Sequence, residues 1–559
     1  MKDTGEWRDS IELRRAHSAF IVFFFLMGAG LSTSCGETFS GIDAAMPAAG
    51  AAGTDPTGAA GEGNLEAGGA SGIAGASTAP ADGGSSAGGE GGATAGTGGD
   101  DASGTGGTAG RGGEPNTPPP PCDWTQPVHG CAVTAKDGIF VTPEGDDEAD
   151  GTPEQPLASL REGVARARAM AKRRPVFVCA ASFDEHVEIH HDGIRLQGGF
   201  ACPESTTDVW IYNAGERPRL APSTQGYALR VRDAEKITVA DFELRVVNGE
   251  VLGDNSVAVF ATNAIDVAFE RTLIQSGNGA DGEPGVLMPY KYVDLPESNP
   301  ATEEIGAEPL TCTCAGSAIP TVGGRGGNGG AERTDGDAGQ PLYAGTGAGG
   351  RAFEQDCAVA RGQDGGDAPA TRAEPGARVL GAATISGWEP STANIGRTGA
   401  PGQGGGGGAG VLSGAKFAAL GGQSGQCGGC GGQGGAGGRA GGASIGVLSY
   451  VSRVTLLDSE IRTGQGGTGG AGAPGQAGQR GRTRLSRDCQ SGGGGGKGGT
   501  GGLGGGGAGG ISVGVVWTGG TAPALESTQV FTGEAGMPGG VDGENKAIPG
   551  VSLAVLAAP

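Results

Sequence analysis

Hydrophobic and polar positions alternate over short runs of the chain, and this alternation predicts short β-strands. A period of two places every second side chain on the same face of a strand, so one face is buried and the other is solvated. Alternating apolar pairs occur at Val187 and Ile189, Ile194 and Leu196, Leu229 and Val231, and Ile237 and Val239. After the segment 151–160, a stretch that reaches to about Arg173 instead shows helical spacing, with Leu157, Leu160 and Val164 on one face. The sequence therefore predicts a mostly β chain with an early helix.

The alternating runs also repeat. Leu229 and Val231 are followed by Ile237 and Val239 at offsets of 8 and 10 residues from Leu229, and the same offsets link Val257 and Val259 to Ile265 and Val267. This step of 28 residues suits one coil of a β-solenoid. Residues 444–447 and 512–515 show the same Ser-apolar-Gly-Val pattern and are predicted to be further coils.

Three coils end on the same motif, an aliphatic residue followed by any residue, a hydroxyl residue and glycine. It occurs at 274–277, 461–464 and 530–533, and glycine-rich sequence starts directly after each copy. We therefore expect the glycine tracts to leave one corner of a stacked coil and return to the next. This predicts coils at 201–276, 444–463 and 512–559, separated by glycine-rich insertions at 277–443 and 464–511.

Glycine accounts for 122 of the 559 residues, and it recurs at every third position in the runs 422–437, 466–481 and 492–510. A flexible linker needs glycine without a period. A helix of the polyproline type has three residues per turn and no internal hydrogen bonds, so one bare edge lets neighbouring backbones approach. The period predicts polyglycine II-like bundles or ordered loops, and a disordered low-complexity segment is the alternative.

Three pieces of sequence between residues 139 and 200 carry a resemblance to a known family. They are the strand 139–141, the Gly-Thr-x-x-x-Pro-Leu-x-Ser-Leu helix start at 151–160, and Gly-Gly-Phe at 198–200. This succession resembles the N-terminal cap of pectate-lyase-like proteins of bacterial surfaces. The resemblance implies an all-β, right-handed parallel β-helix (pectin-lyase-like) with a small α/β cap at 122–200. It implies no activity, because that cap accompanies enzymes and non-enzymes alike.

The N-terminus has the layout of an export signal. Arg14 and Arg15 precede an apolar run at 19–31, which is too short to span a membrane comfortably. The run ends in Leu-Ser-Thr-Ser before Cys35 and resembles a bacterial lipobox, although the leucine lies four residues before the cysteine instead of three. We expect a lipoprotein-type signal peptide at 1–35 with Cys35 as the lipid acceptor. Ordinary cleavage beside Cys35 is the alternative. Residues 36–121 are rich in Gly, Ala, Ser and Pro and are predicted to be a disordered linker.

Charge and cysteine content agree with export. A net charge of −23 argues against nucleic acid as a partner, because phosphate contacts require clustered Lys and Arg. Eleven cysteines leave an even ten once Cys35 is set aside, which predicts disulfides in an oxidising compartment. The disulfide candidates are Cys122, Cys131, Cys179, Cys202, Cys312, Cys314, Cys357, Cys427, Cys430 and Cys489. A four-thiolate zinc site at Cys312, Cys314, Cys427 and Cys430, or a redox-active Cys427–Cys430 pair, is the alternative.

One strand carries candidate metal ligands. His186, Glu188 and His190 share a face with Asp184, and two histidines flanking a carboxylate can hold Zn²⁺ or Ni²⁺. However, His186 and His190 would lie about 13 Å apart along a strand, which is too far for one ion. A solvated strand face is therefore the favoured interpretation, and we expect no metal here.

Candidate catalytic residues come from the resemblance. Pectate-lyase-like enzymes typically use Ca²⁺ held by clustered carboxylates, together with a basic residue that removes a proton. Lys236 lies among Asp233, Glu235, Asp241 and Glu243, which superficially supplies both parts. Other coils offer no matching acidic residues in the same register, and such placements are common by chance on exposed coil faces. We therefore expect no catalytic residues and no cofactor, and Ca²⁺ only if the chain is an enzyme.

Together these observations predict an exported, lipid-anchored protein at the outer membrane or cell surface of a bacterium. Its expected role is structural, adhesive or glycan-contacting, without catalysis. The expected partners are the cell-envelope membrane, reached through the lipid anchor, and a polysaccharide or another surface protein. The alternative function is a Ca²⁺-dependent polysaccharide lyase or hydrolase of the same fold.

Lipidation of Cys35 can be tested directly. Mass spectrometry of the mature protein is expected to find Cys35 at the N-terminus with an added lipid mass, because a lipobox cysteine is both the cleavage site and the acceptor. The variant Cys35→Ser should lack the added mass and should leave the membrane fraction. An unmodified Cys35 would remove the predicted anchor.

Overall fold

The computed structural model describes residues 119–559, except for 125–126, 171–173, 206–208, 353–356 and 413–419. The predicted signal peptide with Cys35, and the linker up to residue 118, lie outside the described residues. Within the described part of the chain, no helix is long and apolar enough to cross a membrane.

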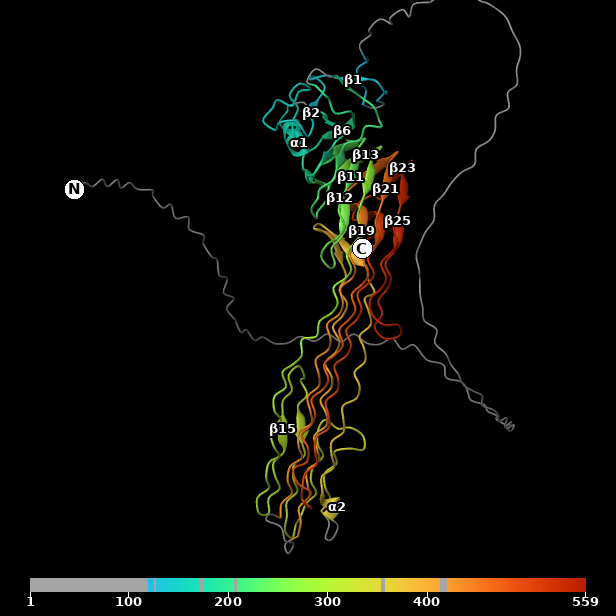
Figure 1. The fold of residues 1–559 in the computed structure, drawn as a ribbon. Coiled ribbons are helices and arrows are strands. Elements are labelled where there is room, and N and C mark those ends of the chain that lie inside the picture. The colour runs from blue at the N-terminus through green and yellow to red at the C-terminus, as the bar shows by residue number, and fades with distance from the viewer. Residues whose placement is uncertain (1–118, 125–126, 171–173, 206–208, 353–356, 413–419) are drawn as a thin grey trace, which may run out of the picture. The chain divides into compact units, whose positions relative to one another are not determined.

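The described chain is predominantly β, which confirms the all-β prediction, and its main strands form three parallel sheets (Figure 1). Sheet 1 contains β2 (Ile139–Val141), β3 (Val176–Cys179), β6 (Arg195–Phe200), β10 (Glu235–Ala240), β13 (Ile265–Glu270), β20 (Val454–Leu457) and β23 (Ala524–Glu526). Sheet 2 contains β4 (Ser182–Phe183), β8 (Arg219–Leu220), β11 (Glu243–Arg245), β14 (Leu273–Gln275), β21 (Glu460–Arg462) and β24 (Gln529–Phe531). Sheet 3 contains β5 (Val187–Ile189), β9 (Leu229–Arg232), β12 (Ser256–Thr262), β19 (Ser444–Tyr450), β22 (Ser512–Thr518) and β25 (Ser552–Ala557).

The chain visits the three sheets in a constant order. From β9 onward each coil contributes one strand to sheet 3, one to sheet 1 and one to sheet 2 before the next coil begins. The step between the first two full coils is 30 residues, because Leu229 pairs with Val259 and Ile237 pairs with Val267. The predicted step of 28 is therefore wrong by two residues. A slip of two preserves the alternation of faces, so the apolar pattern alone could not distinguish the two registers.

Aliphatic side chains from all three sheets form the main core. Val231, Val239 and Leu244 of one coil are fully buried together with Val267 and Ile274 of the next. At the N-terminal end α1 (Leu160–Ala169) covers this core with Leu160, Val164 and Ala167. Ser159 caps this helix, because its hydroxyl accepts a hydrogen bond from the backbone N–H of Glu162.

A second, aromatic cluster lies beside the first strands. It contains Phe140, Phe177, Phe200, Trp210 and Tyr212. The short antiparallel pair β1 (Ala132–Val133) and β7 (Trp210–Ile211) borders it, and the disulfides Cys122–Cys131 and Cys179–Cys202 join neighbouring segments there.

Hydroxyl pairs join the two ends of each glycine-rich insertion. Ser276, at the end of one coil, lies 2.9 Å (Oγ to Oγ) from Ser444, at the start of the next. The same pairing joins Thr463 to Ser512 and Thr532 to Ser552, at 2.8 Å in both cases. The serine of each pair also donates to a glycine carbonyl, as Ser512 Oγ does to Gly464 O at 2.8 Å. The hydroxyl of the repeated closing motif therefore holds the two chain ends of an insertion together.

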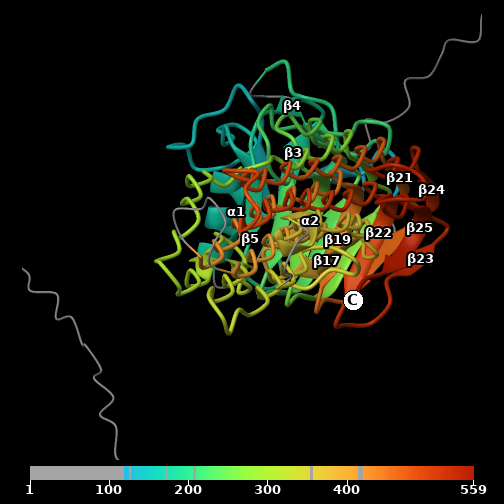
Figure 2. The ribbon, with the colours of Figure 1, turned by 90° about the horizontal axis from the view of Figure 1, so that it is seen from below.

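The glycine tracts are extended segments that run side by side, and Figure 2 views them roughly end-on. Backbone hydrogen bonds connect neighbouring segments at every third residue. The N–H groups of Gly429, Gly432 and Gly435 donate to the carbonyls of Gly496, Gly499 and Gly502 at 2.8–3.0 Å. These tracts are neither α-helix nor β-strand. The three-residue period thus reflects a bundle of the polyglycine II type, one of the predicted arrangements.

Residues 402–410 lie at the centre of this bundle, and every one of them is buried. Successive N–H groups there turn toward different neighbours: Gly405, Gly406 and Gly407 donate to Gln426, Gln363 and Asp337. The carbonyls of Gly405, Gly407 and Gly406 accept from Gly324, Gly350 and Gly493 of three further segments. The central segment therefore has six hydrogen-bonded neighbours. With three residues per turn, each residue of this segment points toward a neighbouring backbone. A side chain would have no room there, which explains why glycine fills nearly all of its positions.

Peripheral segments have glycine only on their inner faces. In 465–483 every third residue is exposed, and these are Gln465, Thr468, Ala471, Pro474, Ala477, Arg480 and Thr483. Side chains replace missing neighbours at some outward N–H groups: Asp281 accepts from the N–H of Thr468 at 2.7 Å, and Asp364 from that of Gly494 at 2.7 Å. The register of glycine therefore shows which residues of a tract meet solvent.

Three disulfides cross-link the bundle: Cys312–Cys427, Cys314–Cys430 and Cys357–Cys489. Cysteines two apart in one segment pair with cysteines three apart in the other. A strand returns to the same face after two residues and a three-residue helix after three, so the two spacings match β15 (Leu310–Cys312) beside a glycine segment. All ten candidate cysteines are in disulfides, so the zinc and free-dithiol alternatives are wrong.

The insertions contain few other elements. β15 pairs with β16 (Thr321–Gly323), and β17 (Gly381–Thr384) forms a hairpin with β18 (Gly387–Pro390). The one described helix of the insertions is the short α2 (Cys357–Ala360). Trp388 of the hairpin packs on the outer face of sheet 3 with Val257 and Phe260.

Close backbone packing makes a direct prediction for glycine substitutions. A Cβ added at Gly495 would lie 1.9 Å from the carbonyl oxygen of Cys427, whereas one at Gly494 would meet nothing closer than 3.1 Å. We expect Gly495→Ala to destabilise the bundle by about 2 kcal/mol or more and Gly494→Ala to cost clearly less. Amide hydrogen exchange of residues 423–438 measures the effect. Equal protection in the two variants would contradict the packing described above.

Candidate functional site

The closing strands of successive coils place a row of polar side chains on the outer face of sheet 2. Each of these three-residue strands has an apolar middle residue, and Leu244, Ile274 and Ile461 are fully buried. The residues on either side must then face outward. The parallel register puts Arg245 beside Gln275, Gln275 beside Arg462, and Arg462 beside Phe531.

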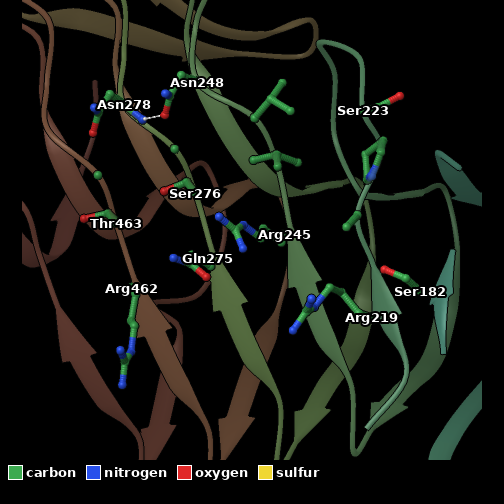
Figure 3. Close-up of a pocket in the computed structure, with 16 residues that line it drawn as sticks. Ser182, Arg219, Ser223, Arg245, Asn248, Gln275, Ser276, Asn278, Arg462 and Thr463 are labelled. Atoms are coloured by element: carbon green, nitrogen blue, oxygen red, sulfur yellow. Dashed lines mark hydrogen bonds between the residues drawn. The ribbon is translucent and has the colours of Figure 1, made fainter. Parts of the chain in front are cut away.

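An open groove of about 610 Å³ runs along this face, between the strands and the start of the insertions (Figure 3). Arg219, Arg245, Gln275 and Arg462 line it from four different strands. Ser182, Ser223, Asn248, Ser276, Asn278 and Thr463 complete its polar lining. None of the lining residues, all of which belong to the described chain, is acidic.

The three arginines differ in their partners. Arg219 lies 2.9 Å (Nε to Oε2) from Glu243 on the neighbouring strand, and Arg462 pairs with Glu460 of its own strand. Arg462 also lies over the ring of Phe531, with 5.6 Å from the guanidinium carbon to the ring centroid. Arg245 forms no ion pair with any described residue. The groove therefore contains one unpaired cation between two partly neutralised ones.

Asparagines fix one rim of the groove. Asn248 Oδ1 accepts from the N–H of Asn278 at 2.8 Å (Figure 3). Asn278 Oδ1 accepts in turn from the N–H of Gln465 at 2.8 Å. These side chains bind the backbone of the next coil, so they connect the points where successive insertions begin. The rim is therefore positioned by the coil repeat.

Chemically, the groove offers hydrogen-bond donors and acceptors without an acid–base pair. Guanidinium and amide groups suit hydroxyl, carboxylate or sulfate oxygens. A hydrolytic or eliminative site needs a group that accepts a proton, and it usually comes from Asp, Glu, His or Lys. Among the described residues, none of these types lines the groove. The arrangement is suited to binding.

Sequence reasoning did not find this groove. Its arginines lie in three short strands, and Arg245 and Arg462 are 217 positions apart in the printed sequence. The available signal was the polar-aliphatic-polar triplet that closes each coil, Glu-Leu-Arg at 243–245 and Glu-Ile-Arg at 460–462. Only the pairing of these triplets through β14 brings the arginines to one face.

The candidate catalytic residues do not converge on one site. Asp233 lies before β10, Lys236 is the second residue of that strand, and Asp241 follows its last residue. Each has a left-handed backbone, with φ of 51°, 59° and 58°. Asp233 is exposed, lies 3.8 Å (Oδ2 to Nε) from Arg232, and accepts from Asn263 Nδ2 at 3.1 Å. The sharp bends before and after the strand account for Asp233 and Asp241, because Asp tolerates this conformation better than most residues.

Asp241 belongs to a buried polar network. It is fully buried, and its carboxylate accepts from Arg271 Nε and Nη2 at 2.8 and 3.0 Å, from Gln197 Nε2 at 2.7 Å and from the Tyr212 hydroxyl at 2.9 Å. Burial, and next the negative charge of Asp241, raise the pKa of Tyr212 to about 12. Burial alone would lower the pKa of Arg271, but the hydrogen bonds and charge of Asp241 raise it. The network joins the coils to the aromatic cluster and occupies both oxygens of Asp241.

The candidate metal ligands are also held by other groups. His186 Nδ1 lies 2.7 Å from the carbonyl of Tyr227, and its Nε2 lies 2.9 Å from Thr224 Oγ1. Glu188 pairs with Arg232 at 3.1 Å, and the His190 ring contacts that of His191 in a tilted arrangement, with ring centroids 4.0 Å apart. Across the described residues, no group of three or more His, Cys, Asp or Glu side chains is arranged to hold a metal ion.

The role of Asp241 can be tested against a matched position. Asp458 occupies the same kind of bend on a later coil, with φ of 47°, but its side chain is exposed. We expect Asp241→Asn to lower the free energy of unfolding by about 3 kcal/mol, because it breaks the ion pair of a fully buried carboxylate and leaves the partly buried Arg271 with only Glu270, 3.7 Å away (Nη2 to Oε2). Asp458→Asn should change it by less than about 0.5 kcal/mol. Denaturant unfolding measures both, and equal losses would show that the bend, and not the network, is what matters.

Comparisons with known proteins leave the family open. The sequence matches no protein family and no curated protein. Among solved structures, it resembles a GH136 lacto-N-biosidase from Eubacterium ramulus, with 18% identity and a TM-score of 0.19 over 25% of this chain and 27% of that one. It also resembles a rhamnogalacturonan lyase, with 15% identity and a TM-score of 0.13 over 24% and 36% of the two chains. The match thus spans about a third or less of each of those proteins, and neither likeness is close enough to bear on activity.

Proposed function

We propose that this protein is an exported, lipid-anchored surface protein that contacts glycans passively through the groove on sheet 2. The observation that supports this most is the lining of the groove, which combines three arginines, seven amide or hydroxyl side chains and, among the described residues, no acidic residue. Such a set can hydrogen-bond the hydroxyl groups of a sugar polymer. A shallow, open face also suits a polymer better than a small molecule, which usually needs a closed pocket.

We further propose that the coils form a right-handed parallel β-helix of the pectin-lyase type. The constant order of visits to three parallel sheets supports this fold. Its faces are long and regular, so a linear polymer can contact several coils at once. The same regularity explains why the groove draws its residues from consecutive coils.

The cellular setting follows from the disulfides and the N-terminal sequence. Five disulfides are typical of a protein that folds outside the reducing cytosol. The lipid anchor at Cys35 and placement at the outer membrane remain part of the proposal. In this setting the partners would be the membrane, through the anchor, and a polysaccharide or another surface protein at the coils.

The alternative is a polysaccharide lyase or hydrolase that uses the same fold, with Ca²⁺ as a possible cofactor. No observation on the groove favours it, because the lining lacks a proton-accepting side chain. The carboxylates near the groove, Glu243 and Glu460, are each engaged by an arginine. Direct measurement of turnover separates the two functions.

The test uses the full exported chain with pectate, alginate and neutral dextran, each with and without added Ca²⁺. We expect retention of at least one polymer and no new chain ends, because the groove can bind but has no acid–base pair. Binding is measured by affinity electrophoresis, and turnover by unsaturated products and new reducing ends. Unsaturated or shortened products would overturn the passive role in favour of the enzyme. Failure of every glycan to bind would overturn the glycan contact itself.

A further inference from the structure

The row of side chains across sheet 2 has a regular spacing. Arg245, Gln275, Arg462 and Phe531 occupy the same position on four consecutive strands. Neighbouring strands lie about 4.8 Å apart, so the backbones that carry Arg245 and Arg462 are separated by about 10 Å. A ligand that follows this row must run across the strands, along the direction in which the coils stack.

Charge along the row is uneven, and this bears on the ligand. Arg245 has no ion-pair partner among the described residues, while Arg462 shares its charge with Glu460. A guanidinium group binds carboxylate, sulfate or phosphate oxygens through two parallel N–H donors, and it loses less hydration on doing so than an ammonium group does. A neutral sugar would leave the positive charge of Arg245 without a counter-ion inside the groove.

The net negative charge of the protein as a whole would repel an anionic ligand. The positive charge inside the groove is therefore a local exception. The net charge is −23, yet none of the residues that line the groove in the described chain is acidic. Repulsion from distant carboxylates falls off over about 8 Å at physiological ionic strength, so the nearby arginines dominate inside the groove. The acidic residues of the same strands, Glu243 and Glu460, form ion pairs with Arg219 and Arg462.

An exposed aromatic ring ends the row. Phe531 is 52% exposed, and Arg462 lies over its ring. The face of this ring that Arg462 does not cover can pack against the C–H face of a sugar. Arg462 pairs with Glu460 through Nε, and its remaining N–H donors can reach an anionic substituent. Phe531 therefore adds apolar contact area where the charge of the row decreases.

We propose that this row binds a linear glycan bearing carboxylate or sulfate groups, with the polymer crossing the strands from Arg245 to Phe531. Arg245 and Arg462 bind anionic groups about 10 Å apart, Gln275 between them binds a hydroxyl group, and Phe531 packs on a sugar face. This rests on the proposed glycan contact and adds the charge class of the glycan and its direction.

The test compares three polymers on the full exported chain: dextran sulfate, polygalacturonate and unmodified dextran. We expect the first two to bind and to be displaced by added salt, because ion pairs in an open groove are screened. Arg245→Gln should weaken polyanion binding roughly tenfold, the loss of one charge-assisted contact. Phe531→Ala should weaken binding of both polyanions several-fold without changing its salt dependence.

Arg453→Gln provides a matched control, because Arg453 is an exposed arginine outside the groove that pairs with Asp266. It changes the net charge as Arg245→Gln does, and it should leave binding within about twofold. Equal weakening by both variants would show that only the net charge matters, and this would overturn the proposal. Equal binding of unmodified dextran, unaffected by Arg245→Gln, would overturn the charge selectivity and leave the glycan contact intact. Binding of none of the three polymers would overturn both.

Discussion

Close approach of one backbone to another is the constraint on which most of this structure depends. In the glycine bundle, neighbouring segments share backbone hydrogen bonds at every third residue, such as those of Gly429, Gly432 and Gly435 at 2.8–3.0 Å, with no side chain between them. A Cβ on Gly431 would lie 1.8 Å from the carbonyl oxygen of Gly399, so even alanine does not fit there. The bundle is stabilised by backbone hydrogen bonds and exclusion of water, because it has almost no apolar side chains to bury. Its glycines pay a large conformational entropy on ordering, which explains the need for cross-links.

The coils hold together the two chain ends of each glycine-rich insertion. The hydroxyl pairs Ser276–Ser444, Thr463–Ser512 and Thr532–Ser552 bring the outgoing and returning chains together before the glycine segments begin. Because the coils are in register, the segments that leave them start in register as well. The three disulfides of the insertions then connect segments that are 115 to 132 residues apart in sequence. Long loops lose the most freedom when closed, so these cross-links restrict the unfolded chain strongly.

The same register builds the groove. Sheet 2 contributes only short strands, and each one alone presents two outward side chains. Stacking places Arg245, Gln275, Arg462 and Phe531 in one row, although the insertion 277–443 separates the second from the third in sequence. The coil scaffold therefore has two roles. It anchors the glycine bundle through the hydroxyl residue of the closing motif, and it aligns the polar side chains of the sheet 2 strands that come just before that hydroxyl residue. The proposed glycan contact uses the aligned face.

By itself the sequence determined the strand alternation, the helix near Leu160, the ten paired cysteines and the three-residue glycine period. Each of these is local, or follows from composition, so neighbouring residues are enough to reveal it. The coil step was misread by two residues, because a shift of two leaves every side chain on the same face. Lys236 and Asp241 are close in sequence, which made them candidates, but the fold places Lys236 near the start of β10 and Asp241 after its end, in a buried ion pair with Arg271.

Tertiary structure alone decided which segments of the bundle are neighbours, how the cysteines pair and where the arginines of the groove meet. The physical reason is that these features depend on register between segments more than a hundred residues apart. Glycine repeats can slide past one another by three residues without losing a hydrogen bond, so their own sequence does not fix the alignment. The coils and the disulfides fix it, and they do so only in the folded chain.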